Sequence, residues 1–312
     1  MKKLIALLLV VVMVGAMAAG FAGCKKEDDG FKVAIVLAEY NEWNKNYEKK
    51  VIEKCEAWGW TYQIFDAKQD ANTQIDHVRS VISQGFDAMT IQAVDMAALA
   101  PVVTEAADAG VIVVDHYGFT NEQVPSDKIY QNLFDQKGAG KLQAEEYIKA
   151  AGETGKVAII AGLTGASNAM ARTEGFMEVL NKYPGIEVVA TEYCDWDTQK
   201  AQTAAENILT AHPDLSAFLV QDDGMSKGVW NAIEAAGKAE TCKIASQGFY
   251  GYSIEYIESD KFMFTIAYPA GNFSIAAMDM IKNHVDGVAQ DRVSYVGMSL
   301  VTKENCRTTD HD

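Results

Sequence analysis

The 312-residue sequence lacks the common signatures of catalysis. It contains no GxSxG, HExxH or GxxxxGK motif, and the stretch GLTG at 162–165 lacks the lysine that a phosphate-binding loop needs. The five histidines are scattered, without the spacing of a metal site. Asp195 and Asp197 are two positions apart in one expected loop, an arrangement that rarely flanks a scissile bond. We therefore expect no enzyme, no metal and no cofactor, with an enzyme as the disfavoured alternative.

Basic residues are scarce relative to acidic ones. The chain has 27 Lys and Arg against 43 Asp and Glu, which gives a formal net charge of −16. Because such a surface repels a phosphate backbone, nucleic acid is excluded as a partner. Proline is also rare, with 5 residues, whereas 49% of the chain is hydrophobic. This composition can form a large core, and the length suggests two domains rather than one.

Charged residues are absent from positions 4–23, directly after two lysines. An apolar run, LIALLLVVVMV, leads into small residues, which is the pattern of a signal peptide. The segment ends in FAGC, which resembles the bacterial lipoprotein box, with phenylalanine in place of the usual aliphatic residue. We expect a lipoprotein signal peptide at 1–23, acylation of Cys24, a tether at 24–30 and a domain held outside the cytoplasm at the cell membrane. An uncleaved membrane anchor is the alternative, since roughly 20 uncharged residues could span a bilayer.

Cysteine is rare beyond this leader. Cys55, Cys194, Cys242 and Cys306 are an even number in an oxidising compartment, so one or two disulfides are possible. Their spacing matches no metal-site pattern. We expect free, half-buried thiols, with disulfides as the alternative.

Short apolar runs alternate with helix-length amphipathic segments from residue 32 onward. The expected strands are 32–39, 61–67, 87–93 and 111–116, then 156–162, 187–193, 216–221 and 242–249. The expected helices are 44–58, 71–84, 97–109, 135–151, 167–182, 198–211, 226–236 and 272–285. Runs such as VAIVL and VIVV are apolar on both faces, as in a parallel sheet covered by helices on both sides. The pattern predicts an α/β protein with a Rossmann-like, doubly wound parallel sheet in each half.

Residues that follow the strands are the first candidates for a binding site, because doubly wound sheets bind ligands beyond the carboxyl ends of their strands. A carboxylate accepts two hydroxyl hydrogen bonds, a guanidinium donates in a fork, and an aromatic ring covers the apolar face of a sugar. Such side chains suit a small polyhydroxylated ligand. The candidates are Asn41, Glu42, Trp43, Asn44, Asp115, His116, Arg172, Trp196, Asp222, Tyr250 and Tyr268.

From about residue 31 to 305, the chain resembles the type I periplasmic binding proteins of the ribose-binding group. The resemblance is carried by a series of phrases in a fixed order: VIVVDH (111–116), AMARTEGF (169–176), CDWD (194–197), TAHPD (210–214), VQDDGM (220–225), TIAY (265–268) and LVTKEN (300–305). It implies a monomer that binds a small molecule, most often a sugar, between two lobes, and that delivers it to ABC permease subunits. Ligand contacts from both lobes would favour the closed state. A sensor that presents its closed form to a membrane receptor or histidine kinase is the alternative.

The implied lobes are joined by three strands and are discontinuous in sequence. The N-terminal lobe would comprise 31–131 and 269–297, and the C-terminal lobe 132–268 and 298–312. The crossings would lie near Gln131-Asn132, Tyr268-Pro269 and Gly297-Met298.

The resemblance also implies roles for single residues. Asp115 would accept hydrogen bonds from two hydroxyls, Arg172 would donate to a ring or hydroxyl oxygen, and Asp222 would bind a hydroxyl. Trp43 and Trp196 would sandwich the sugar ring from opposite lobes. The loop residues Asn41, Glu42 and Asn44 would add polar contacts, and His116 stands where many members have an arginine.

Two tyrosines depart from the family pattern. Sugar binders usually have an aspartate at the position of Tyr250 and a glutamine or asparagine at that of Tyr268. Phenols offer fewer acceptors and more apolar surface than the residues they replace. The ligand is therefore expected to be less hydroxylated or larger than a pentose, and its identity stays open.

Most candidates also have a structural explanation. Asp115 and Asp222 end apolar strands, where a carboxylate can cap a helix or accept loop amides. Arg172 could be a solvated helix charge, Trp196 a core residue and His116 a satisfied buried histidine. We expect Asp223 to be an N-cap outside the site.

Overall fold

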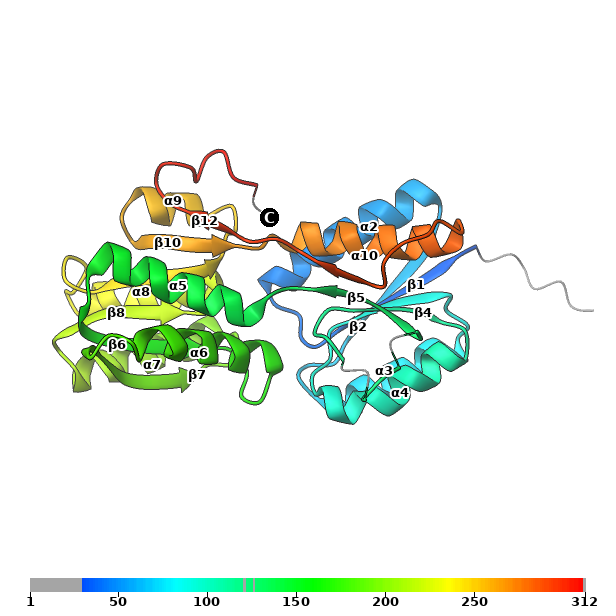
Figure 1. Cartoon of the computed structure of the whole chain (residues 1–312), viewed down its shortest axis with the longest axis horizontal. Helices are drawn as coiled ribbons and strands as arrows, with labels where there is room; N and C mark the ends of the chain where they lie inside the picture. The colour runs from blue at the N-terminus through cyan, green and yellow to red at the C-terminus, as the bar shows by residue number, and fades with distance from the viewer. Residues whose placement is uncertain (1–29, 120–121, 126, 311–312) are drawn as a thin grey trace, which may run out of the picture.

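The computed structural model describes residues 30–119, 122–125 and 127–310, so the expected signal peptide and Cys24 lie outside the described residues. The described chain forms two lobes, each built on one six-stranded sheet with helices on both faces (Figure 1). None of the helices in these ranges is long and apolar enough to cross a membrane.

The first sheet has the strand order β11-β5-β4-β3-β1-β2, and its pairs run parallel. Helices α2 and α10 cover one face of this sheet, and α3 and α4 cover the other (Figure 1). Because both faces are covered, the runs VAIVL and VIVV, which read as apolar on both sides, are largely buried in β1 and β4. The elements are β1 (Lys32–Leu37), α2 (Glu42–Trp58), β2 (Thr61–Asp66), α3 (Ala71–Ser83), β3 (Ala88–Ile91), α4 (Met96–Asp108), β4 (Ile112–Asp115), β5 (Ile129–Leu133), α10 (Ala270–Val285) and β11 (Val293–Tyr295).

The second sheet has the order β12-β10-β9-β8-β6-β7. Helices α5 and α6 pack on one face, and α7, α8 and α9 on the other. Strand β12 runs antiparallel to β10, which departs from the expectation of a purely parallel sheet. The elements are α5 (Gln136–Ala151), β6 (Thr154–Ala161), α6 (Ser167–Leu180), β7 (Gly185–Tyr193), α7 (Thr198–Ala211), β8 (Leu215–Val220), α8 (Asp223–Ala235), β9 (Lys243–Gly248), α9 (Ser253–Glu258), β10 (Phe262–Ala267) and β12 (Ser299–Val301).

The described chain crosses between the sheets at three places, which lie together in the middle of Figure 1. One crossing separates β10 from α10, and another separates β11 from β12. The first crossing follows Leu133, not Gln131 as expected. Asn132 and Leu133 still pair with β11 of the first sheet, so the expected lobe boundary falls inside β5.

The four cysteines within the described ranges are free and buried, and not half-buried as expected. Burial raises the pKa of Cys55, Cys194 and Cys242 to about 12. These thiols therefore stay protonated at neutral pH and act as small apolar core residues.

Candidate ligand-binding site

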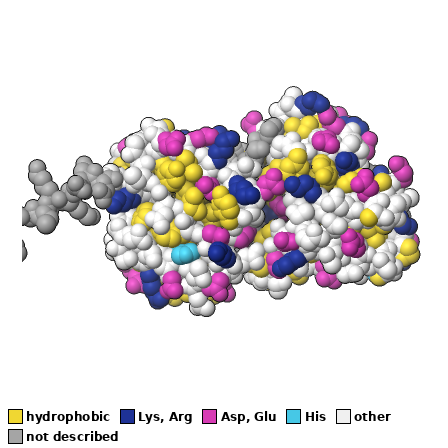
Figure 2. Space-filling view, turned by 180° about the vertical axis from the view of Figure 1, so that it is seen from behind, with side chains coloured by type: hydrophobic (Ala, Val, Ile, Leu, Met, Phe, Trp, Pro, Cys, Tyr) yellow, Lys and Arg dark blue, Asp and Glu magenta, His cyan; other side chains and the backbone are white. Residues whose placement is uncertain are grey.

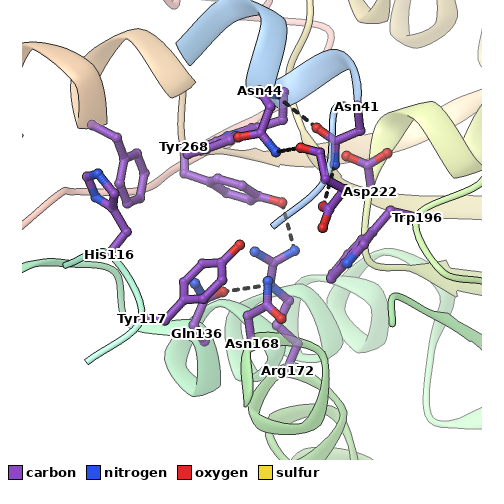
Figure 3. Close-up of a pocket in the computed structure, with 13 residues that line it drawn as sticks. Asn41, Asn44, His116, Tyr117, Gln136, Asn168, Arg172, Trp196, Asp222 and Tyr268 are labelled. Atoms are coloured by element: carbon purple, nitrogen blue, oxygen red, sulfur yellow. Dashed lines mark hydrogen bonds between the residues drawn. The ribbon is translucent and has the colours of Figure 1, made fainter. Parts of the chain in front are cut away.

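A cavity lies between the lobes, where strands of both sheets end (Figure 3); its empty space is about 500 Å³ when its opening to solvent is included. The first lobe lines it with Glu39, Asn41, Trp43, Asn44, His116, Tyr117 and Phe273, and the second lobe and the crossing with Gln136, Asn168, Arg172, Trp196, Asp222 and Tyr268.

The start of α2 places two unsatisfied polar atoms at the cavity. Asn41 caps the helix, because its Oδ1 accepts a hydrogen bond of 2.9 Å from the Asn44 amide. The Asn44 side chain is 1% exposed and donates through Nδ2 to the Glu39 carbonyl at 2.8 Å. Within the described chain, Asn44 Oδ1 and Trp43 Nε1 are buried without a hydrogen-bond partner. A buried acceptor and a buried donor at one cavity are suited to a polar ligand.

Glu39 lies directly after β1 and brings a carboxyl group to the same wall. Its Oε1 accepts a hydrogen bond from Asn41 Nδ2 at 2.9 Å. Burial, followed by the charges of Asp66 and Asp222, raises the pKa of Glu39 to about 7. This carboxyl therefore exchanges its proton near neutral pH.

Arg172 reaches the cavity from α6, in the second lobe. Its side chain is 4% exposed and donates to Gln136 Oε1 at 2.7 Å, to the Gln221 carbonyl at 2.7 Å and to the Tyr268 hydroxyl at 2.8 Å. The guanidinium also lies over the rings of Tyr268 and Trp196, at 4.8 and 5.5 Å from their centroids. Arg172 is thus a fixed, buried cation of the site and not a solvated charge on the helix surface.

Aromatic rings face the cavity from both lobes. Trp43 stacks on Tyr47 with centroids 5.5 Å apart and meets Phe273 edge-on at 5.3 Å. Trp196 belongs to the other lobe, where it lies in the loop between β7 and α7 beside Arg172 (Figure 3). Its φ of 58°, after 52° at Asp195, holds two successive non-glycine residues in the left-handed region. Because this conformation costs free energy, it marks the loop as a candidate functional segment.

Asp222 is both a helix cap and a lining residue. Its Oδ1 accepts hydrogen bonds from the amides of Gly224 and Met225 at the start of α8. Its Oδ2 accepts one from the Tyr250 hydroxyl at 2.7 Å. Tyr250 is 2% exposed and does not line the cavity, so the expectation that it contacts ligand is replaced by a role in orienting Asp222.

Asp115 is fully buried and absent from the lining, contrary to the expected ligand contact. Its carboxylate accepts hydrogen bonds from the amides of Tyr117, Gly118 and Phe119 and from Gln131 Nε2. Burial raises its pKa, and these four hydrogen bonds act in the opposite direction. The carboxylate therefore fixes the loop that carries Tyr117, which is the structural alternative that the sequence left open.

His116 lines the cavity, yet both of its ring nitrogens have partners in the first lobe. Nε2 lies 2.6 Å from the Tyr47 hydroxyl, and Nδ1 lies 3.3 Å from the Asn132 carbonyl. Burial lowers the pKa of His116 to about 4, so the ring is neutral at physiological pH. The Nδ1 proton donates to the carbonyl, and Nε2 accepts from Tyr47.

Glu42 faces the other lobe but not the cavity. Its Oε2 lies 3.3 Å from Lys227 Nζ of α8, an ion pair that joins the lobes. Gln69 Nε2 donates to the Asp195 carbonyl at 3.1 Å, also across the cleft. These two contacts join the lobes across the cleft.

Asp223, expected to be an N-cap, is instead the first residue of α8, since Asp222 is the cap. It is fully buried and accepts hydrogen bonds from the hydroxyls of Ser246, Ser253 and Thr265 and from the Phe249 amide. Burial raises its pKa to about 6. Asp223 thus anchors α8 beneath the site.

Eight of the eleven predicted site residues line the cavity: Asn41, Trp43, Asn44, His116, Arg172, Trp196, Asp222 and Tyr268. Glu42, Asp115 and Tyr250 do not. Five lining residues were missed: Glu39, Tyr117, Gln136, Asn168 and Phe273. In the part of the chain that the structure describes, no group of three or more His, Cys, Asp and Glu is placed to hold a metal ion.

Known proteins of similar sequence share this architecture. The sequence pattern of the periplasmic binding protein domain matches residues 33–289. The ribose import binding protein of Bacillus subtilis is 32% identical over 223 residues, which cover 70% of this chain and 69% of that protein. The D-ribose/D-allose-binding protein of Pseudomonas aeruginosa is 34% identical over 178 residues, and the match spans only 56% of either protein.

Solved structures agree in fold. A solute-binding protein from Burkholderia graminis in complex with D-arabinose superposes with a TM-score of 0.83 at 22% identity, covering 92% of this chain and all of that one. One from Actinobacillus succinogenes with bound D-allose gives 0.81 at 24% identity, covering 90% of this chain and all of that one. The chain therefore belongs to the periplasmic binding protein family, whose members are non-catalytic solute-binding proteins.

Proposed function

We propose that this protein binds one small sugar or sugar-like polyol between its lobes and delivers it to an ABC permease. One observation carries the proposal. The cavity presents indole rings from opposite lobes, Trp43 and Trp196, together with the polar side chains of Asn44, Arg172 and Asp222. Aromatic faces cover the C–H surface of a sugar ring, while amide, guanidinium and carboxylate groups bind its hydroxyls.

The proposed mechanism is closure about the three crossings. Trp43 and Asn44 belong to the first lobe, whereas Arg172, Trp196 and Asp222 belong to the second. A ligand that touches both sets binds the closed form better than the open form and shifts the population toward it. The closed shape would then be recognised by the permease.

The ligands in the names of the related proteins support this assignment. They include import or binding proteins for ribose, ribose and allose, and apiose, and the solved structures include complexes with D-allose, D-arabinose and myo-inositol. These ligands are all small and polyhydroxylated. The variety among them supports the class of ligand and leaves its identity to experiment.

Export and lipid anchoring are the second part of the proposal. The uncharged leader and FAGC at 21–24 support cleavage before Cys24 and acylation of its thiol. Expression of the full chain in a bacterium should place the protein in the membrane fraction, with a mass that includes the acyl groups. A Cys24→Ala variant should leave the membrane fraction, and its retention there would contradict lipid anchoring.

A thermal-shift and calorimetric screen against monosaccharides, disaccharides and polyols tests the binding function. At least one monosaccharide or polyol should raise the melting temperature, and Trp196→Ala should reduce that shift. Tyr62→Ala is the matched control, because Tyr62 is an exposed aromatic residue on the edge strand β2. Absence of any shift across the panel, or equal loss in both variants, would contradict the proposal.

A further inference from the structure

We propose that the ligand carries a basic amino group, and that the site takes an amino sugar or an amino-deoxy polyol with its ammonium held by Glu39, Asn44 and Asp222. The inference rests on the proposed function and deepens it by naming the class of ligand.

Charge in the cavity is unbalanced. Glu39 of the first lobe and Asp222 of the second both line it, and Arg172 is the one cationic side chain among the described lining residues. His116 contributes no charge, because burial lowers its pKa to about 4. Asp66, at the end of β2, adds negative charge close to Glu39. When Glu39 and Asp222 are both ionised, the lining has a net negative charge that one ammonium would neutralise.

Hydrogen-bond acceptors also outnumber donors on the Glu39 side of the cavity. Asn44 is 1% exposed, and its Oδ1 has no partner in the described chain. Glu39 Oε2 accepts no hydrogen bond from the described residues, and Asp222 Oδ2 accepts one, from Tyr250. In Figure 3 the Asn44 amide points from α2 into the cavity, and Asp222 approaches from the other lobe. An ammonium supplies three donors and no acceptor, whereas a hydroxyl supplies one donor.

The cation already present does not satisfy these acceptors. Arg172 donates to Gln136, Gln221 and Tyr268, and none of its described hydrogen bonds goes to a carboxylate. Its charge lowers the pKa of Asp222 from a distance, while burial raises it. Glu39 therefore lacks a positive partner within the described lining.

Proton linkage distinguishes a charged ligand from a neutral one. Burial and the charges of Asp66 and Asp222 raise the pKa of Glu39 to about 7, and the Tyr117 hydroxyl, whose own pKa burial and the Glu39 charge raise, is a further titratable neighbour. An ammonium beside Glu39 favours its ionised form, so binding releases a proton at and below neutral pH. Affinity for an amino sugar should then rise with pH until the amine itself loses its proton. A neutral sugar gives no such rise.

Titration calorimetry with the purified protein tests this with matched pairs: D-glucosamine, D-galactosamine and D-mannosamine beside D-glucose, D-galactose and D-mannose. Amino-deoxy inositols beside myo-inositol, and the neutral sugars D-ribose, D-allose and D-arabinose, complete the panel. At least one amino compound should bind about tenfold or more tightly than its neutral parent, as expected for hydrogen bonds to charged groups. Buffers of different ionisation enthalpy should report the released proton.

Three variants distinguish an effect of the Glu39 charge on binding from a loss of folding. Glu39→Gln should remove both the preference for the amino compound over its neutral parent and the release of a proton on binding. Glu56→Gln is the matched control, because Glu56 is an exposed carboxylate of the first lobe, on α2, and does not line the cavity. Asp66→Asn should move the pH profile of amino-sugar binding to lower pH, because the Asp66 charge raises the pKa of Glu39. This variant tests the electrostatics even if Glu39→Gln does not fold.

Binding confined to neutral sugars, or amino sugars that bind no more tightly than their parents, would overturn the inference and leave the proposed function intact. No binding by any compound of the panel would overturn both. Putrescine carries charge without a ring or hydroxyls, and its binding at the affinity of the amino sugars would also overturn the inference.

Discussion

Replacing Gly162 with alanine should displace Trp196 and weaken ligand binding. Gly162 directly follows β6, and a Cβ at this position would lie 2.0 Å from Cζ2 and 2.2 Å from Cη2 of the Trp196 indole. Because carbon atoms prefer separations of about 3.5–4.0 Å, the indole has to move by about 1.5–2 Å. Overpacking of this kind costs about 1–3 kcal/mol. If the cost is met by moving Trp196 out of its binding position, affinity should fall roughly 5- to 150-fold.

Titration calorimetry with the tightest-binding sugar of the screen would measure this loss. The double-mutant cycle with Trp196→Ala isolates the cause, since Gly162→Ala should add no further loss once the indole is gone. Gly185→Ala is the matched control, because a Cβ there would also be crowded, 2.7 Å from the Glu153 carbonyl oxygen, but Gly185 begins β7 and does not line the cavity. Unchanged affinity in Gly162→Ala, or a loss that simply adds to that of Trp196→Ala, would refute the reasoning.

Three further predictions concern hydrogen bonding, pH and thiols. Tyr250→Phe removes the hydrogen bond to Asp222 and should weaken binding by about 1–2 kcal/mol in calorimetry. Tyr252→Phe removes a buried hydroxyl that has no hydrogen-bond partner among the described residues and should not weaken binding, so equal effects of the two variants would contradict the orienting role. Burial raises the pKa of Glu39 to about 7 and of Asp223 to about 6. The folded state therefore keeps protons on these two carboxyls that the unfolded state releases, which lowers the free energy of unfolding as the pH rises from 5 to 8. Buried His116, whose pKa is lowered to about 4, acts in the opposite direction over the same range. The net free energy of unfolding should fall by about 1–3 kcal/mol, as measured by urea denaturation. Glu39→Gln should flatten this dependence, and a rise in stability with pH would contradict it. Finally, the four buried cysteines should react with Ellman's reagent only after unfolding, without prior reduction; recovery of fewer than four thiols would indicate a disulfide.

Much of the fold is predictable because strands buried on both faces leave continuous apolar runs. The strands of both sheets that were expected from such apolar runs are present in the structure, as are the amphipathic helices between them. Strand β5 has the sequence IYQNL, which contains no continuous apolar run. Its polar residues Gln131 and Asn132 stand near the end of the strand, where the chain leaves the core toward the crossing. Helix α9 has six residues, too few for a helical period to show.

Site residues that lie at the ends of strands can be predicted from the sequence, whereas those whose contacts depend on tertiary packing cannot. Asp222 and Trp196 could be predicted because they lie in polar phrases shortly after the strands that end at Val220 and Tyr193. Asp115 has the same local signature, yet the turn at Tyr117–Phe119 folds back and occupies its oxygens. Phe273 reaches the cavity from α10, a helix contributed by the last part of the chain, so no neighbouring residue in the sequence indicates its role.

The three crossings also determine when each lobe can finish folding during synthesis. Helix α10 supplies Phe273, Met278 and Ile281 to the core that it shares with β1 and α2, and β11 completes the same sheet. Until these segments emerge from the ribosome, one apolar face of the first lobe stays uncovered. The second sheet likewise awaits β12, whose Val301 is fully buried. Neither lobe can close its core before nearly the whole chain has been made, and a chain that stays unfinished for so long remains available to an export machinery that threads it through a membrane unfolded.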